Sequence, residues 1–599
     1  MAITRMTGGL GSVRYLGLLL VAGLLTTLPI ALAQQYPSAY QIFTDGTAVV
    51  VDDYASMPPS SLRGDAAYPA PINYSDQLGR PNSFRSEPSD APLSATRFFV
   101  VDQNGTLYIL DKATKKFTPY LEIGKIYPKF TTDPVYGLGF VSIQFDPGYA
   151  KNGKFYTVHT EKPSMPGSNA PNNASLPSLN LSGFTTTDAI NSPAGEVGFE
   201  SILTEWTDTN IKNSTFEGTS RELLRAGLNF GLHPMADMIF NPLAKPGSPD
   251  YGNLYISVGD GTAGERAGPT HTIPQRLDAL PGKILRITPD ITLRPKDMLS
   301  SNGRYRIPST GLDPNPFISV KIARPEVFAY GLRNPHRLSW DPETNTLIAP
   351  DIGNHLWEEI NIIVKGANYG WAEREGPEQT FIGGPNSGKT GSTVTPPVPF
   401  PSDDKLVVEG LEAPVTPLYP VAFYSHQDGV AMGAGFVYRG KLMPQLNGKY
   451  VFSEITTGRL FYTDIKDMIA AHGIHNKSAQ IHEIQIMYKS PYDKSAQVPV
   501  KWRMYDIVAE GFSHKGGTPA PNSVVPGASA LTGGTRGTNT SEPKLDPYGV
   551  KYGGGRADVR MARGGDGEIY LLCKADGWIR KLVAVATPPP AAKATAKAH

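Results

Sequence analysis

Short turns followed by apolar runs recur along most of this chain. In six places a turn containing Asn, Asp or Gly leads into a run of aliphatic, β-branched or aromatic residues: 104–108, 152–156, 251–255, 344–348, 447–451 and 566–570. Turns of this kind ahead of such runs are typical of β-hairpins, so each stretch predicts a strand. Further runs at 458–462 and 577–581 predict second strands.

The recurrence of turn and strand favours an all-β fold, a β-propeller in which each blade is a small sheet packed against its neighbours. Six openings predict six blades. Their spacing is irregular, so we expect long loop insertions in the polar segments at about 161–195, 375–415 and 512–555. A pair of β-sandwiches is the alternative architecture.

The two ends of the chain differ from its middle. Arg5 and Arg14, an apolar run over 15–28 and small residues up to Ala33 predict a signal peptide over residues 1–33. A retained membrane anchor is the alternative, but the run is short for a bilayer span. We interpret 34–93 as an irregular N-terminal extension, 94–585 as the propeller domain and 586–599 as a disordered tail. These features predict a secreted or periplasmic protein without stable membrane insertion after signal removal.

Composition and charge limit the classes of fold, partner and metal site that the protein can have. The 599 residues carry 56 basic and 55 acidic side chains, a net charge of +1, which gives no electrostatic attraction to nucleic acid. The 62 Gly and 54 Pro residues favour a turn-rich β fold over a helical one. The single cysteine, Cys573, excludes an intrachain disulfide and a Cys-based zinc site, and its apolar neighbours predict a buried side chain.

Three polar residues beside predicted strand ends are candidates for catalysis. His233 precedes a short strand, Asp260 follows the strand at 256–258, and Arg333 lies between a glycine turn and Asn334-Pro335. Each alone has an ordinary structural explanation. Together they could remove a hydroxyl proton, support the imidazolium and polarise a carbonyl, which suits oxidation of an alcohol.

Two downstream stretches are rich in oxygen ligands. Carboxylates and turn carbonyls lie close together in 351–361 and 365–371, the kind of donors that calcium prefers, although a surface loop is the simpler explanation. No His pair suggests zinc, and no Gly-rich turn suggests a dinucleotide or a P-loop.

Several motifs in the same order resemble a known family. The segments 330–335 (YGLRNP), 353–361, 366–371 and 282–286 are similar to those of the glucose/sorbosone dehydrogenase family, soluble aldose dehydrogenases that use pyrroloquinoline quinone (PQQ). The similarity extends from about Thr96 to Leu582. The resemblance implies a six-bladed propeller that oxidises a sugar.

The resemblance also implies roles for individual residues. His233 takes the place of the general base that removes the sugar hydroxyl proton as hydride passes to the quinone, and Asp260 that of its supporting carboxylate. Arg333 lies where the family polarises the quinone carbonyl, Asn334 where it touches the cofactor, and Arg556 near a cofactor-carboxylate arginine.

Calcium is implied in the same way. The backbone carbonyls of Gly353 and Asn354 match the positions that hold the cofactor's calcium. Glu359 and the carbonyl of Tyr369 match part of a second, structural calcium site.

Some positions depart from the family pattern. Residues 136–139 lack a cofactor glutamine, 454–458 lack a lysine, and Glu265 lies near the place of another glutamine. These changes weaken the expected binding of a tricarboxylate. Two hypotheses follow: a secreted, calcium-dependent quinoprotein that passes electrons to an external acceptor, and a cofactor-free propeller that binds a carbohydrate or protein partner through its loops. A propeller hydrolase or lactonase is a third.

Overall fold

The computed structural model describes residues 42–60, 78–131, 137–266, 268–354, 356–381, 392–393, 404–426, 428–475, 477–515 and 556–585. They belong to one compact unit, residues 39–599. The predicted signal peptide (1–33) and tail (586–599) lie outside the described residues, as does most of the predicted loop at 512–555. Among the described helices, none has the length and apolar character needed to cross a membrane.

Four sheets contain four or five strands each. The first has the order β2 (Pro81–Arg85), β3 (Arg97–Asp102), β4 (Thr106–Asp111), β5 (Phe117–Glu122). The second has the order β6 (Phe140–Phe145), β7 (Lys154–Glu161), β9 (Phe199–Asp208), β10 (Gly218–Leu228), β8 (Leu179–Asn180). The third has the order β11 (Met235–Phe240), β12 (Leu254–Val258), β13 (Lys283–Ile287), β16 (Val327–Tyr330). The fourth has the order β17 (Ser339–Asp341), β18 (Thr346–Asp351), β19 (Trp357–Ile362), β23 (Ala422–Ser425).

A larger sheet joins the two ends of the described chain. Its order is β24 (Met432–Val437), β25 (Lys449–Glu454), β26 (Leu460–Asp464), β27 (Ile481–Tyr488), β1 (Ile42–Ser56), β31 (Trp578–Ala584), β30 (Ile569–Cys573), β29 (Val559–Arg563), with β28 (Val500–Lys501) beside β27. Small sheets pair β14 (Met298–Leu299) with β15 (Arg306–Ile307), and β20 (Arg374–Glu375), β21 (Glu378–Phe381) and β22 (Ser392–Thr393). The α-helices in the described part of the chain are α1 (Ile123–Ile126), α2 (Tyr149–Asn152), α3 (Ile465–Ala471) and α4 (Met504–His514).

All six predicted openings are confirmed as turns that lead into strands, namely β4, β7, β12, β18, β25 and β30. Each turn contains one residue with a left-handed backbone: Gly105, Gly153, Gly252, Asn345, Gly448 and Gly567. Gly and Asn adopt this conformation most readily, which explains the turn residues in the sequence pattern. At Gly153 a side chain is also excluded, because a Cβ would lie 2.0 Å from the Asp208 carbonyl oxygen.

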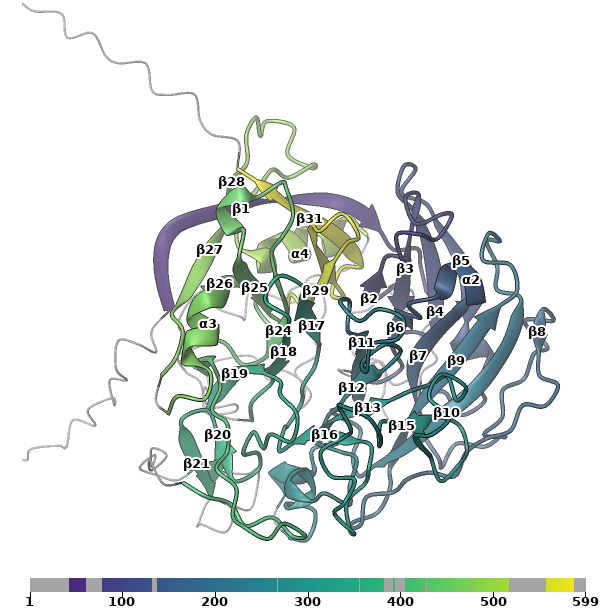
Figure 1. Cartoon of the computed structure of the whole chain (residues 1–599). Helices are drawn as coiled ribbons and strands as arrows, with labels where there is room; N and C mark the ends of the chain where they lie inside the picture. The colour runs from purple at the N-terminus through teal and green to yellow at the C-terminus, as the bar shows by residue number, and fades with distance from the viewer. Residues whose placement is uncertain are drawn as a thin grey trace, which may run out of the picture. The chain divides into compact units, whose positions relative to one another are not determined.

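Buried apolar clusters connect each group of strands to the next. Clusters lie between the first and second sheets, the second and third, the third and fourth, the fourth sheet and β24–β27, and β24–β27 and β29–β31. Phe84 and Phe98 of the first sheet pack with Tyr570 and Leu572 of β30, which closes the series. The sheets therefore stand around a common centre, as propeller blades do (Figure 1). The number of blades stays a prediction, because β1 merges two strand groups into one sheet.

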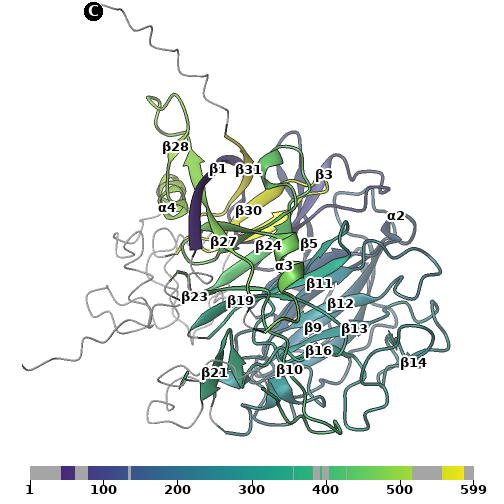
Figure 2. The ribbon, with the colours of Figure 1, turned by 60° about the vertical axis from the view of Figure 1, so that its left-hand side comes forward.

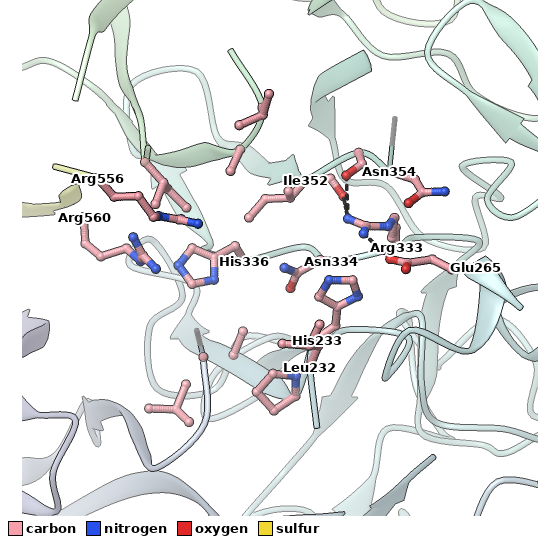
Figure 3. Close-up of a pocket in the computed structure, with 18 of the residues that line it drawn as sticks. Leu232, His233, Glu265, Arg333, Asn334, His336, Ile352, Asn354, Arg556 and Arg560 are labelled. Carbon is pink, nitrogen blue, oxygen red and sulfur yellow. Dashed lines mark hydrogen bonds and ion pairs between the residues drawn. The ribbon is translucent and has the colours of Figure 1, made fainter. Parts of the chain in front are cut away.

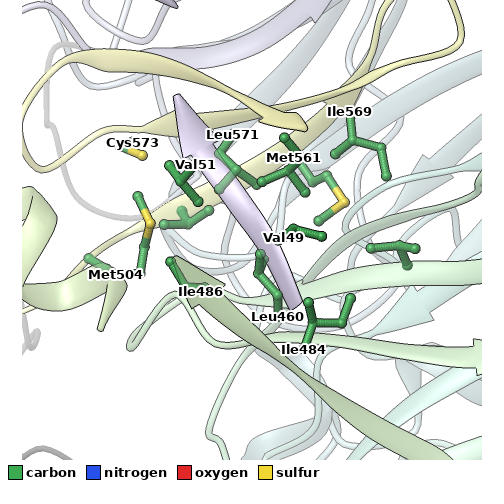
Figure 4. Close-up of a cluster of buried hydrophobic side chains, with 14 of the residues drawn as sticks. Val49, Val51, Leu460, Ile484, Ile486, Met504, Met561, Ile569, Leu571 and Cys573 are labelled. Atoms are coloured by element: carbon green, nitrogen blue, oxygen red, sulfur yellow. The ribbon is translucent and has the colours of Figure 1, made fainter. Parts of the chain in front are cut away.

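The segment interpreted as an irregular extension contains regular structure. Within 34–93, β1 pairs in parallel with β27 and antiparallel with β31, and β2 begins the first sheet. Figure 2 shows β1 beside β27 and β31. Val49 and Val51 are buried in the cluster that β24–β27 share with β29–β31 (Figure 4). Burial of the apolar run that contains them offsets the conformational entropy that is lost when this strand becomes ordered.

Candidate active site

A cavity of about 250 Å³ lies where strand ends and loops from several sheets meet. Its volume is close to the lower end of the range of about 300–1,000 Å³ that is usual for small-molecule sites. The polar part of its wall consists of Asn82, His233, Glu265, Arg333, Asn334, His336, Asn354, His426, Arg556 and Arg560. Figure 3 shows Arg556 and Arg560 on one side of this cavity and Arg333 with Glu265 on the other.

His233 and Asp260 form a hydrogen-bonded pair at the wall. His233 precedes β11 and Asp260 follows β12, and the antiparallel pairing of these strands brings the two loops together. Nδ1 of His233 lies 2.8 Å from Oδ1 of Asp260. A carboxylate at this distance fixes the proton on Nδ1, so Nε2 keeps its lone pair. Among the described residues, Nε2 has no hydrogen-bond partner.

The surroundings of Asp260 keep its carboxyl group ionised. Burial alone would raise its pKa, but the hydrogen bond and charge of His233 and the charge of Arg333 hold the pKa below its usual value. The backbone N–H of Thr262 and the indole N–H of Trp371 also donate to this carboxylate, at 2.7 and 2.8 Å. Asp260 is therefore a fixed anion behind His233.

The backbone around this pair is tightly constrained. His233 has a φ of +53°, which is uncommon for a residue with a side chain. Gly259 passes directly beside it, and a Cβ at residue 259 would lie 2.6 Å from the Cβ of His233. The Gly-Asp turn read from the sequence thus lets the chain approach the histidine closely.

Most of the hydrogen-bond donors of the Arg333 guanidinium are already used within the protein. Nη1 donates to the carbonyl oxygens of Ile352 at 2.7 Å and Gly353 at 2.6 Å, and Nη2 pairs with the Glu265 carboxylate. The Arg333 carbonyl accepts the backbone N–H of Asp260 at 2.7 Å. Only Nε has no hydrogen-bond partner among the described residues.

Asn334 and His336 add two more unsatisfied polar atoms to the wall. Asn334 Oδ1 and His336 Nε2 are buried without a hydrogen-bond partner in the described part of the chain. Burial, followed by the charges of Arg337 and Arg560, lowers the pKa of His336 well below its usual value, so the ring is neutral. Unsatisfied buried polar atoms on a cavity wall point to a polar ligand. The sequence analysis missed His336, although it directly follows the Arg-Asn-Pro motif.

Two arginines form the opposite side of the cavity. Arg556 lies just before β29, and Arg560 lies within it. Nη1 of Arg560 donates to Oδ1 of Asp558 at 2.7 Å. Guanidinium groups bind carboxylates well, so this side of the cavity suits an anionic group of a ligand. Arg560 was not predicted from the sequence.

The ligands predicted for the two separate calcium sites lie in different places. Gly353 and Asn354 line the cavity, but Glu359 and Tyr369 are not part of its wall. The Glu359 carboxyl accepts the Gly376 N–H, and burial followed by the charge of Asp351 raises its pKa to about 8. Among the described residues, no group of three or more His, Cys, Asp or Glu side chains is arranged to hold a metal ion.

A second histidine–carboxyl pair, missed by the sequence analysis, borders the same cavity. Nε2 of His426, which lines the wall, lies 2.8 Å from Oε1 of Glu358 in β19. Oε2 of Glu358 accepts the Met432 N–H at 2.6 Å. Burial raises the pKa of Glu358 well above its usual value. Successive side chains of a strand point to opposite faces, so Glu358 and Glu359 of β19 lie on different faces of the sheet. This alternation is the sequence signal that could have distinguished Glu358 from the predicted ligand Glu359.

The structure thus brings most of the predicted site residues to one cavity. His233, Arg333, Asn334 and Arg556 line it, and Asp260 supports His233 from behind. Their chemical roles stay predictions.

Comparison with known proteins confirms the family resemblance over part of the chain. Residues 246–398 match the family model described as Glucose / Sorbosone dehydrogenase. This stretch contains Asp260, Glu265, Arg333 and Asn334, but neither His233 nor Arg556.

Two curated relatives match at the sequence level. HIPL1 protein of Arabidopsis thaliana is 27% identical over 333 residues, which cover 53% of this chain and 42% of the relative. Aldose sugar dehydrogenase YliI of Escherichia coli K12 is 35% identical over 120 residues, 20% of this chain and 26% of the relative. The matches span less than half the length of these curated relatives.

Solved structures of sugar dehydrogenases align along most of the chain at low identity. The PQQ-bound aldose sugar dehydrogenase of Streptomyces coelicolor aligns with 18% identity over 90% of this chain and 98% of its own, with a TM-score of 0.44. The apo form of the soluble aldose sugar dehydrogenase of Escherichia coli aligns with 15% identity over 90% and 100%, with a TM-score of 0.46.

Proposed function

We propose, from the match of residues 246–398 to the Glucose / Sorbosone dehydrogenase family and from the geometry of the cavity, that this protein is an oxidoreductase acting on an alcohol group of an aldose or related sugar. The observation that carries the proposal is the His233–Asp260 pair at the cavity wall, with Nε2 of His233 open to a ligand and Arg333 beside the pair.

His233 acts as the general base. Its Nε2 accepts the proton of the sugar hydroxyl, while Nδ1 stays bonded to Asp260. The Asp260 anion stabilises the imidazolium that forms and holds the ring in one orientation. A positioned base of this kind contributes about 10²- to 10⁴-fold to the rate.

Pyrroloquinoline quinone fits the chemistry of the cavity. When bound, it supplies the acceptor for the hydride that leaves the sugar carbon. Arg556 and Arg560 would hold its carboxylates, and the unsatisfied atoms of Arg333 and Asn334 would meet its remaining polar groups. Arg333 is the proposed electrophilic residue, because a buried guanidinium stabilises negative charge that develops on a carbonyl oxygen.

Calcium fits less well in the arrangement observed. The Gly353 carbonyl accepts a hydrogen bond from Arg333, and a guanidinium this close repels a second cation. Binding of calcium at Gly353 and Asn354 would therefore require Arg333 to move, and we derive no step through the metal. A second calcium at Glu359 and the Tyr369 carbonyl stays part of the proposal.

The predicted signal at 1–33 supports a secreted or periplasmic location. Electrons would then leave to an acceptor outside the protein. A cofactor-free binding protein is the second candidate. The observation that favours it is the Glu265 carboxylate paired with Arg333, near the place where the family resemblance implies a neutral glutamine.

The test is calorimetric titration of pyrroloquinoline quinone into the full chain, with calcium and with a chelator, followed by dye reduction with a panel of aldoses. We expect saturable binding and sugar-dependent reduction that His233→Ala abolishes and that His472→Ala, a change in the helix α3 cap remote from the cavity, leaves intact. Absence of cofactor binding would reject the dehydrogenase and leave the binding protein.

A further inference from the structure

The two sides of the cavity carry opposite charge. Around His233 lie the Asp260 and Glu265 carboxylates and the single guanidinium of Arg333. Asp351 also faces Arg333, since its carboxyl accepts the backbone N–H groups of Arg333 and Asn334. The named groups on this side therefore sum to a negative charge.

The opposite side is positive. Arg556 and Arg560 line it, and Nη1 of Arg560 pairs with Asp558 at 2.7 Å. Lys574 is fully buried 3.9 Å from the second oxygen of Asp558. Neutral His336 and Asn334 lie between the two sides (Figure 3).

Glu265 determines the sign of the net charge on the His233 side of the cavity. Its side chain and that of Arg333 are 12% and 7% exposed, so water screens their pair weakly. Both Nη atoms of Arg333 are occupied, one by backbone carbonyls and one by Glu265. An anionic ligand group next to His233 would therefore find only the Nε–H of Arg333 without a partner among the described residues, and it would meet the carboxylates of Glu265 and Asp260.

We propose that Glu265 is a specificity-determining residue that makes the His233 side of the cavity select neutral or amino-bearing sugars and reject sugars that carry a carboxylate. The inference rests on the proposed function, because it places the sugar on the His233 side. A hydroxyl or ammonium group donates hydrogen bonds to a carboxylate, whereas a ligand carboxylate cannot, and like charges in a poorly solvated site repel strongly.

Three probes that share a ring and differ in charge test this selection: glucose, glucosamine in its protonated form and glucuronate. In the holoenzyme we expect kcat/KM for glucuronate at least tenfold below that for glucose, and glucosamine at least equal to glucose. Glu265→Gln frees Arg333 Nη2 and removes one negative charge. It should raise the glucuronate-to-glucose ratio of kcat/KM at least tenfold.

Two variants serve as controls. Glu265→Asp keeps the charge and should keep the discrimination, and Glu409→Gln removes the same charge from an exposed position and should change nothing. If Glu265→Gln does not fold, the wild-type ratios and the Asp variant still decide the matter.

The experiment distinguishes failure of the proposed function from failure of the role proposed for Glu265. If pyrroloquinoline quinone does not bind, the proposed function fails, and the selection is then read from calorimetric binding of the three sugars to the full chain without cofactor. Equal treatment of glucuronate and glucose in the measured readout, or no binding of any of the three sugars, overturns the role of Glu265. Retained dehydrogenase activity in that case leaves the proposed function standing.

Discussion

Two histidine–carboxyl pairs border the same cavity, and they differ in the state of the acid. In the pair of His233 with Asp260, the carboxyl has a lowered pKa and is an anion. In the pair of His426 with Glu358, the carboxyl has a raised pKa and keeps its proton. Both acids are fully buried and both accept at least one backbone N–H, so burial alone does not separate them.

The difference comes from the neighbouring charges. His233, by its hydrogen bond and its charge, lowers the pKa of Asp260, and Arg333 and the Trp371 indole N–H add to this effect. The Met432 N–H and the charge of Arg333 also act on Glu358, but burial and the acidic neighbours Glu454 and Glu375 raise its pKa. The same two residue types thus give an anion that orients a base at one place and a neutral acid that donates to an imidazole at another. A histidine–carboxyl pair indicates a catalytic base only where the surrounding charges favour the carboxylate.

The largest effect is expected for Asp260→Asn. The neutral amide removes the anion that stabilises the His233 imidazolium and allows the other tautomer, so kcat should fall by about 10²- to 10⁴-fold. Steady-state dye reduction at saturating cofactor measures this. A kcat within threefold of wild type, in a variant with an unchanged circular dichroism spectrum, would contradict the assignment.

His426→Ala should act mainly on stability. It leaves the Glu358 acid without its partner, and an unsatisfied buried group costs about 1–3 kcal/mol. Urea unfolding would show the loss as a lower midpoint, and kcat should change less than in Asp260→Asn. A loss of turnover as large as that of Asp260→Asn would show that both pairs are catalytic.

The pH dependence of stability should follow the two carboxyl groups whose pKa values are raised. Burial and neighbouring carboxylates raise the pKa of Asp351 to about 7 and that of Glu359 to about 8. The folded state then binds these protons more tightly than the unfolded state, so their stabilisation is complete below about pH 4 and is lost as pH rises to about 8.

Unfolding midpoints measured at pH 5, 6, 7 and 8 in a chelator test this slope. Each group contributes up to about 1.4 kcal/mol per pH unit, and Glu359→Gln should flatten the curve. Asp260 has the opposite sign, because its lowered pKa gives stability that is lost as pH falls below about 4. If calcium binds at Glu359, its addition should remove part of the slope, whereas an unchanged curve would argue against that site.

The smallest effect is expected for Glu358→Gln. The protonated Oε1 of Glu358 donates to His426, and Oε2 accepts from Met432 N–H. A glutamine with its amide nitrogen in place of Oε1 makes the same two hydrogen bonds. The unfolding free energy at neutral pH should therefore stay within about 1 kcal/mol of wild type, because no hydrogen bond is lost. A larger loss would mean that Glu358 is ionised.

The strands were predictable from the sequence because their turns are local. A glycine or asparagine with a positive φ opens each of the six predicted strands, and its cause lies within a few residues of the turn. The strand β1 was missed because the polar residues around the apolar run at 48–51 hid its pattern. Its pairing partners, β27 and β31, lie more than 400 residues away in the chain.

The candidate site could be predicted where motifs carry it. Arg333 and Asn334 come from one short segment. His233 and Asp260 were candidates because they lie beside predicted strand ends, and the resemblance assigned their roles. Arg560 and the pair of His426 with Glu358 reach the cavity only through the packing of separate sheets. The charge state of each acid depends on neighbours that are distant in sequence, so no local pattern could supply it.

The position of β1 in the chain determines when this strand can pair during biosynthesis. Val50 pairs with Val583, so the first of the described strands cannot find one of its partners until about residue 583 has been translated. At about 5–20 residues per second, that interval is roughly half a minute to two minutes. Until β27 is made, the apolar run at 48–51 in β1 has unpaired backbone groups, which is the kind of segment that aggregates. Chaperone binding to the nascent chain is therefore expected to act first on residues 42–56.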